Sequence, residues 1–169
     1  MALLYGGNLD ATARPMGNVG FNHSRVRVTS CVYTGTPTDQ DDIVFGIFKS
    51  NDRIKDIRLS VIDGSATAGA INVGVWTADS SNNGLAITVV DADRFAATKA
   101  IHADIAYPGD SVFEGGGGSL TIADRGKKLH EQAGVSTDPG GNYAIVGEVS
   151  TTADAAVTLL VEIEYVAGD

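Results

Sequence analysis

The sequence predicts a mainly β protein, a β-sandwich or jelly roll with one or two short helices and an extended N-terminal arm. Apolar and polar residues alternate with a period of two along several short segments, which is the pattern of half-buried strands. Turn-forming residues separate these segments at short intervals. Glycine is abundant, at 21 residues, whereas Lys and Glu, which favour helices, are scarce.

The domain organisation follows from length and periodicity. The chain has 169 residues, the size of one ordinary domain. Residues 1–25 lack periodicity and contain Pro15, so we expect an extended arm there, followed by a single β domain over residues 26–169. A domain of this length buries roughly 70% of the surface of its unfolded chain, so its core needs no disulfide or metal.

Seven segments combine strand patterning with flanking turns. In chain order they are Val26–Tyr33, Ile43–Phe48, Asp56–Val61, Ile71–Trp76, Leu85–Val90, Tyr143–Val149 and Val157–Tyr165. In the first segment, valines at alternate positions are separated by Arg27, Thr29 and Cys31, which predicts a half-buried strand. Ile54 is out of phase with the strand that follows it and is expected to mark a bulge or the strand entry.

Two segments favour short helices. Asp91–Ile101 can form one helix with Asp91 or Asp93 as its N-cap. Thr121–Ala133 is the second candidate, and Gly134 follows it as a C-cap residue.

The charge excludes several classes of partner. The formal net charge is −9, from 21 acidic and 12 basic residues. Such a chain gains nothing from approaching a phosphate backbone or an anionic membrane surface. We therefore expect neither nucleic acid nor membrane as a partner, and the N-terminal residues 1–7 have no signal-peptide pattern.

The residues able to carry catalysis do not form a recognisable pattern. Cys31 is the one cysteine, so no internal disulfide exists, and its mid-strand position predicts a buried, inert thiol. His23, His102 and His130 lie at no metal-ligand spacing and are expected to be exposed or capping residues. We expect no enzymatic activity and no cofactor.

Three motifs suggest ligands, each with a simpler explanation. The acidic groups Asp39, Asp41, Asp42 and Asp91, Asp93 could hold Ca²⁺, but neither has the pattern of a calcium loop, and helix capping accounts for the second group. Gly126-Lys127 follows a glycine run but lacks the spacing of a phosphate-binding loop.

Aromatic residues leave one alternative open. Tyr33 and Trp76 lie on the more polar face of their strands, so the chain could be a β-sandwich glycan-binding module of a fibre or adhesion protein. Packing in the core or at an edge is the default interpretation of these side chains.

From about Asp41 onward, short motifs follow one another along the chain: Arg53–Leu59, Ile71–Trp76, Asp91–Ala96, Gly126–Glu131, Tyr143–Ile145 after a turn at Asp138, and Thr158–Val166. The order and spacing of these motifs give a resemblance to the head decoration, or cement, proteins of tailed bacteriophages. It implies a sandwich or jelly-roll fold without catalysis or cofactor. It also implies many copies on the exterior of a virion capsid, which stabilise the shell by bridging its subunits. The implied partners are the major capsid protein and further copies of the chain, as a dimer or trimer.

Two segments outside the strand pattern are the expected contact residues for such a partner. One is the apolar tip of the arm, Leu3, Leu4 and Tyr5. The other is the run of four glycines, Gly115, Gly116, Gly117 and Gly118, which we interpret as a hairpin tip.

Overall fold

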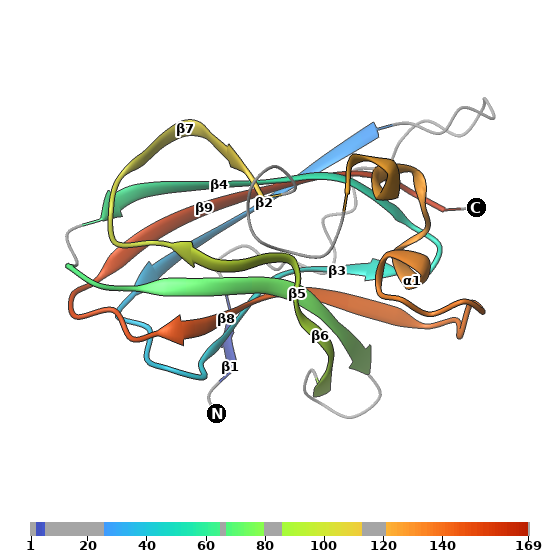
Figure 1. Cartoon of the computed structure of the whole chain (residues 1–169), viewed down its shortest axis with the longest axis horizontal. Helices are drawn as coiled ribbons and strands as arrows, with labels where there is room; N and C mark the ends of the chain where they lie inside the picture. The colour runs from blue at the N-terminus through green and yellow to red at the C-terminus, as the bar shows by residue number, and fades with distance from the viewer. Residues whose placement is uncertain (1–2, 6–25, 65–66, 80–85, 113–120, 169) are drawn as a thin grey trace.

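The computed structural model describes residues 3–5, 26–64, 67–79, 86–112 and 121–168. Within these residues, two β-sheets pack face to face as a sandwich (Figure 1). The first sheet contains β1 (Leu3–Tyr5), β3 (Asp42–Lys49), β8 (Asn142–Thr151), β5 (Ala70–Asp79) and β6 (Ala86–Ala100), in that spatial order. The second contains β2 (Val26–Gly35), β9 (Val157–Val166), β4 (Arg53–Gly64) and β7 (Ile105–Ser111). The predicted mainly β sandwich is therefore confirmed. The expected extended arm is not tested, because residues 6–25 lie outside the described residues.

Neighbouring strands are antiparallel throughout both sheets except at one edge. The short strand β1 runs parallel to β3, whereas the other described pairs are antiparallel. The expected irregularity at Ile54 is a bulge, because the register of β4 against β9 shifts between Ile54 and Asp56.

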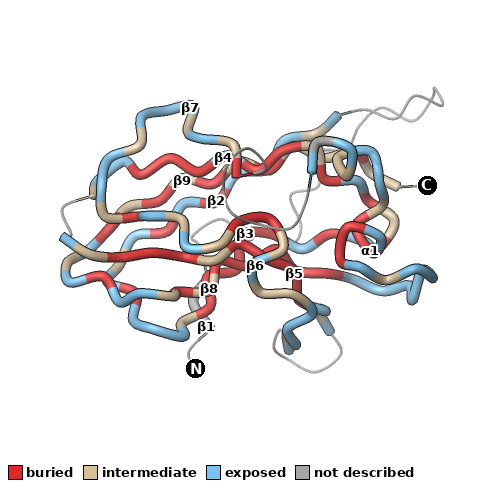
Figure 2. Tube along the Cα trace, viewed as in Figure 1, coloured by how far each residue is buried: buried red, intermediate tan, exposed pale blue. Residues whose placement is uncertain are grey.

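The main core lies between the two sheets and takes one face of each central strand (Figure 2). Its β4 and β9 members are the out-of-phase Ile54 and residues that the period-two pattern predicts: Ile57, Leu59, Val61, Val157, Leu159, Val161 and Ile163. Tyr165 is half-buried at the end of this row, where its ring meets that of Phe48 edge to face with centroids 5.0 Å apart.

The helix expected at Asp91–Ile101 is wrong, because these residues belong almost entirely to strand β6. The side chains of Phe95 and Ala96 are buried in the core between the sheets. The Arg94 guanidinium donates a hydrogen bond through Nε to the backbone oxygen of Gln132. Pairing with β5 and these contacts outweigh the helical preference of the Ala-rich segment.

The second expected helix, Thr121–Ala133, forms as two short pieces. A 3-10 helix, η1 (Ile122–Gly126), is followed by one turn of α-helix, α1 (Leu129–Gln132). Lys127 and Lys128 between them have extended backbones. Gly134 follows α1 with a φ of +81°, the left-handed conformation expected of a residue that ends a helix.

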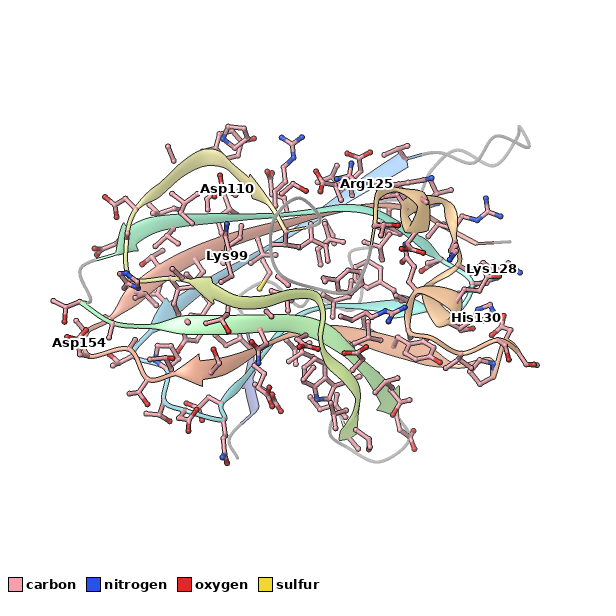
Figure 3. The ribbon with its side chains drawn as sticks, in the orientation of Figure 1. Lys99, Asp110, Arg125, Lys128, His130 and Asp154 are labelled. Carbon is pink, nitrogen blue, oxygen red and sulfur yellow. The ribbon has the colours of Figure 1, made fainter. Side chains whose placement is uncertain are left out.

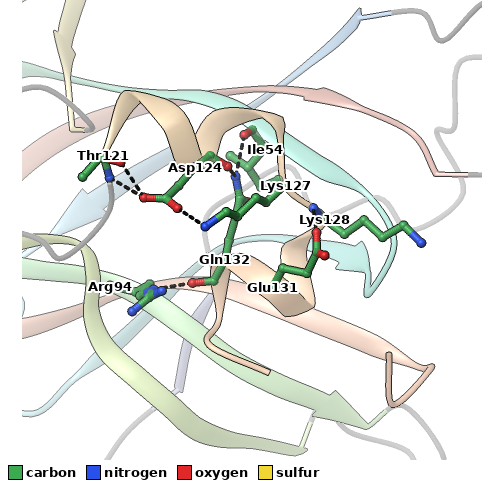
Figure 4. Close-up of polar contacts among 8 residues, drawn as sticks. All are labelled: Ile54, Arg94, Thr121, Asp124, Lys127, Lys128, Glu131 and Gln132. Atoms are coloured by element: carbon green, nitrogen blue, oxygen red, sulfur yellow. Dashed lines mark hydrogen bonds and ion pairs between the residues drawn. The ribbon is translucent and has the colours of Figure 1, made fainter. Parts of the chain in front are cut away.

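Hydrogen bonds fix the two helical pieces against one end of the sandwich (Figure 4). Asp124 accepts hydrogen bonds from Thr121 Oγ1 at 2.8 Å and from Lys127 Nζ at 2.6 Å. The contacts with Lys127 and Thr121 lower the pKa of Asp124 to about 2. The buried Gln132 amide donates to the backbone oxygens of Ile54, at 3.0 Å, and Asp124, at 2.8 Å. This end of the domain is therefore tied to β4 by buried polar contacts.

Candidate interaction surface

One of the two predicted contact segments lies among the described residues. Leu3, Leu4 and Tyr5 form β1, whose backbone pairs with β3 in a register that places Leu3 beside Asp42 and Tyr5 beside Val44. The second segment, Gly115–Gly118, lies outside the described residues. Contact with another protein remains a prediction for both segments.

Strand β2 exposes a row of valines that the period-two pattern would place on its buried face. Cys31 and Tyr33 point into the core and are 3% and 8% exposed. The valines between and before them point outward: Val26 is 55% exposed, Val28 is 62% exposed and Val32 is 44% exposed. Three valines alternating with polar residues look like a buried face. Cys31 and Tyr33 have the opposite parity, and they are the signal that could have identified the correct face.

The position of β2 in its sheet leaves its second edge open in the described part of the chain. Its pairing with β9 runs without a register shift from Val26, opposite Val166, to Gly35, opposite Val157. Among the described residues, β9 is its one ladder partner, and β2 is the last strand on that side of the sheet. A regular edge strand presents a row of backbone N–H and C=O groups, which can pair with another strand.

The opposite edge of this sheet, formed by β7, has a different geometry. β7 pairs with β4 only through Ser111, Asp110 and Ile105, and its middle arches away from the sheet (Figure 1). Pro108 lies in this arch and has no N–H to donate to a further strand. Lys99 Nζ of β6 contacts Asp110 Oδ2 at 2.9 Å, so an ion pair connects the two sheets beside this edge (Figure 3).

The outer face of the five-stranded sheet carries a second, smaller hydrophobic cluster. Trp76 is 2% exposed and lies with Val44, Ala144 and Val146. The sequence places Trp76 on the more polar face of β5, and the default interpretation of this side chain as packed is confirmed. Because Tyr33 is also buried, the glycan-binding alternative loses the two exposed aromatic faces on which it depended.

A row of polar side chains crosses the same outer face. Thr98 N donates to Asn72 Oδ1 at 2.9 Å, and Asn72 Nδ2 donates to Glu148 Oε2 at 3.3 Å. Asp42 lies opposite Glu148 and is fully buried. Neither of its carboxyl oxygens accepts a hydrogen bond from a described residue. Burial first, and then the negative charges of Glu148 and Asp41, raise the pKa of Asp42 to about 6.

Cys31 has the properties of a structural thiol. It is buried, and burial raises its pKa to about 11, so it carries almost no thiolate at neutral pH. Its Sγ lies 3.8 Å from the backbone oxygen of Val44. The predicted burial of Cys31 is confirmed.

The two histidines among the described residues contact backbone oxygens. His130 is buried, which corrects the expectation of an exposed or capping residue, and its Nδ1 donates to the backbone oxygen of Ser50 at 3.0 Å (Figure 3). His102 is half-buried with Nδ1 3.1 Å from the backbone oxygen of Gly69. His23 lies outside the described residues.

The acidic loops and the Gly-Lys pair also have structural partners. Asp41 accepts hydrogen bonds from Thr38 N and Thr38 Oγ1, at 2.9 and 2.8 Å, which closes a turn. Asp91 forms an ion pair with Arg94 at 3.5 Å within β6, so it caps no helix. Lys127, after Gly126, pairs with Asp124.

Across the described ranges, no three His, Cys, Asp or Glu side chains gather as a metal-binding group. In the same ranges, no helix is long and apolar enough to span a membrane.

Comparison with known proteins gives similarity at the level of fold. No family model matches the sequence, and no curated protein matches it. A chain in the solved structure "Capsid of Ralstonia phage GP4" superposes with a TM-score of 0.56 and 20% sequence identity, over 99% of each chain. A chain in "Cyanophage Pam1 capsid asymmetric unit" has a TM-score of 0.49 and 17% identity, over 95% of this chain and 98% of that one. The first comparison shows that the whole domain shares its fold with a protein found in a phage capsid.

Proposed function

We propose that the protein is a structural component of a bacteriophage virion, which binds the outer surface of the capsid and stabilises it by bridging neighbouring capsid subunits. The observation that carries the proposal is the fold shared with the Ralstonia phage GP4 capsid chain over 99% of both chains. The sequence resemblance to decoration proteins supports it from independent motifs.

The charge of the chain supports a position outside the shell. A net charge of −9 would oppose close contact with the packaged genome, whereas it has no such cost on the exterior. The described residues also offer broad sheet faces and edges, which suit contact with another protein.

The proposed contacts with the major capsid protein are the arm tip, Leu3, Leu4 and Tyr5, and the glycine segment, Gly115, Gly116, Gly117 and Gly118. A protein that binds only the assembled shell shifts the equilibrium toward that shell by mass action. Shells that carry it should therefore withstand heat or chelation better than shells without it.

The test is reconstitution. Shells assembled from the major capsid protein alone are mixed with the purified chain, separated from free protein, and their composition and melting temperature are measured. We expect saturable binding with a fixed ratio to the capsid subunit and a raised melting temperature. No binding to intact shells, or binding only to disrupted shells or to their inner surface, would contradict the proposal.

The arm is tested by a variant that keeps the backbone pairing of β1. Replacing Leu3, Leu4 and Tyr5 by Ser should lower occupancy on shells, as should deletion of residues 2–20. The thermal unfolding of the free variants serves as the control for folding. Full occupancy of the folded Ser variant would remove the arm tip from the contact.

A further inference from the structure

The edge of β2 that no described strand covers has a sequence that is complementary to itself. The strand reads V-R-V-T-S-C-V-Y-T from Val26 to Thr34, with Ser30 at its centre. If a second β2 lay antiparallel with the two Ser30 residues opposed, Val28 of each copy would face Val32 of the other. Valine pairs directly opposite each other stabilise antiparallel strands.

In this register no two residues of like charge lie opposite each other in the paired β2 strands. Arg27 is the one charged residue of β2, and it would lie opposite Tyr33 of the second copy. Glu162 and Glu164 project from β9 next to β2. The β9 strands of the two copies would be three strand spacings apart, about 14 Å. That separation exceeds the screening length of about 8 Å at physiological salt, so their repulsion is weak.

The apolar surface of β2 fits the same arrangement. Val28 and Val32 are 62% and 44% exposed in the single chain. In the paired arrangement each would pack beside a valine of the second copy, and the two outer faces would form one apolar stripe. The contact would therefore remove exposed apolar area from water as well as satisfy backbone groups.

The geometry of the other edge limits how copies can associate. Pro108 and the arch of β7 oppose strand addition on that side, so a head-to-tail chain of sheets through β2 and β7 is not favoured. Association through β2 of both copies uses the same surface twice and closes after two subunits.

We propose that β2 is a dimerisation edge, where two copies of this chain pair antiparallel about a two-fold axis at Ser30 and join their four-stranded sheets into one. This goes beyond binding to a capsid, because the dimer forms in solution without a shell. A two-fold dimer would also give a capsid-bound protein two equivalent capsid-binding surfaces.

Cysteine cross-linking tests the register. Opposed residues of an antiparallel pair have Cα atoms about 4.5 or 5.5 Å apart, within the range that a disulfide spans. Ser30→Cys in the purified full chain should therefore give a covalent dimer under mild oxidation. Thr34→Cys is the matched control, because it is exposed on the same face but would lie eight residues, about 27 Å, from its counterpart.

Charge substitution tests the same contact without a cysteine. Two double variants are compared. One carries Val28→Glu and Val32→Glu, and the other carries Val28→Lys and Val32→Lys. Each should dimerise at least about 100-fold more weakly than the wild type, because like charges would then lie opposite each other. An equimolar mixture should regain the dimer mass, because each Glu would then oppose a Lys. Circular dichroism of the separate variants checks that both remain folded.

Sedimentation of the wild type decides the outcome together with these variants. Three results together support the dimer: a mass of twice 17.4 kDa, rapid cross-linking of Ser30→Cys but not of Thr34→Cys, and recovery of the dimer mass in the mixture of the two charge variants. The proposal would be overturned by a monomer at all concentrations, by a trimer or by unlimited aggregates. It would also be overturned if Thr34→Cys cross-linked as fast as Ser30→Cys. None of these results depends on capsid binding, so failure of the dimer and failure of the proposed function are distinguishable.

Discussion

The two edges of the four-stranded sheet differ in every feature that governs strand addition. β2 keeps one register with β9 along its length, contains no proline and exposes three valines. β7 pairs with β4 near its ends, contains Pro108 and is flanked by the Lys99–Asp110 ion pair. Proline, irregular pairing and nearby charge are the usual means by which proteins block sheet edges. Among the described residues, strand addition is therefore opposed at β7, whereas no such feature opposes it at β2.

The largest predicted effect is the difference in stability loss between a substitution on the buried face of β2 and one on its exposed face. Tyr33→Ala removes a buried ring and should destabilise the fold by about 3 kcal/mol. Val32→Ala, its outward neighbour, should cost under about 1 kcal/mol when measured at a concentration at which the chain is monomeric. Urea unfolding of both variants checks this, and equal costs would mean that the valines are buried in the monomer.

A second prediction tests the point after the arch where β7 comes close to β4 again. Gly109 has a φ of +80°, and a Cβ there would lie 2.6 Å from the backbone oxygen of Leu59. Gly109→Ala should therefore cost about 2–3 kcal/mol, from backbone strain and from the clash. Gly140→Ala is the control, because Gly140 has a φ of +69° but open space around it, and it should cost about 1 kcal/mol. Similar losses of stability in the two variants would contradict the close approach of β7 to β4.

A third prediction concerns Asp42, which is buried on the outer face of the five-stranded sheet, whereas the outward valines of β2 are exposed. Asp42 has a pKa of about 6 in the folded protein, above its ordinary value of about 3.9. As the pH falls from about 6 to about 4, the folded state binds the proton before the unfolded state does, so Asp42 makes stability rise over this range. Above pH 6 the buried charge reduces stability.

Asp42→Asn should therefore stabilise the protein at pH 7 by about 1–2 kcal/mol and remove that part of the pH dependence. Its amide can also donate to Glu148 on the neighbouring strand. Unfolding free energies at pH 4, 5, 6 and 7 provide the measurement. An unchanged pH profile would show that this face is open to water in solution.

The smallest predicted effect is a null result at the protected edge. Tyr107 on β7 is 68% exposed, more than any valine of β2. Tyr107→Glu should nevertheless leave the sedimentation coefficient and the unfolding free energy unchanged, because no strand is expected to add there. A change in association state would show that exposure alone, without an open edge, controls pairing.

The sequence predicts strands best where packing and periodicity agree. β9 alternates except at Leu160, and the apolar residues of its predicted inner face, Val157, Leu159, Val161 and Ile163, are buried in the core. The first part of β6 falls in the predicted strand Leu85–Val90, whereas its second part, from Asp91, has the local signals of a helix: an acidic residue followed by an Ala-rich run. The deciding contacts of β6 are with β5 and with Gln132, and these are distant in sequence.

The candidate surface was less predictable than the fold. A valine row normally indicates a buried face, but in β2 the sandwich buries Cys31 and Tyr33 instead. Trp76 is covered on the outer face of a sheet, where a period-two pattern expects solvent. In both places the local pattern shows the alternation correctly, while the face that becomes buried depends on how the two sheets pack. Whether an edge strand is open likewise depends on sheet order, which periodicity does not encode.

The most direct test of the account is a high-resolution cryo-electron microscopy reconstruction of capsid shells saturated with the purified protein. The account predicts density on the outer surface that contacts neighbouring capsid subunits, with copies joined in pairs by antiparallel β2 strands at local two-fold axes. Density absent from the exterior would contradict the capsid role. Exterior copies whose β2 edges face solvent or a capsid subunit would contradict the dimer while leaving the capsid role in place.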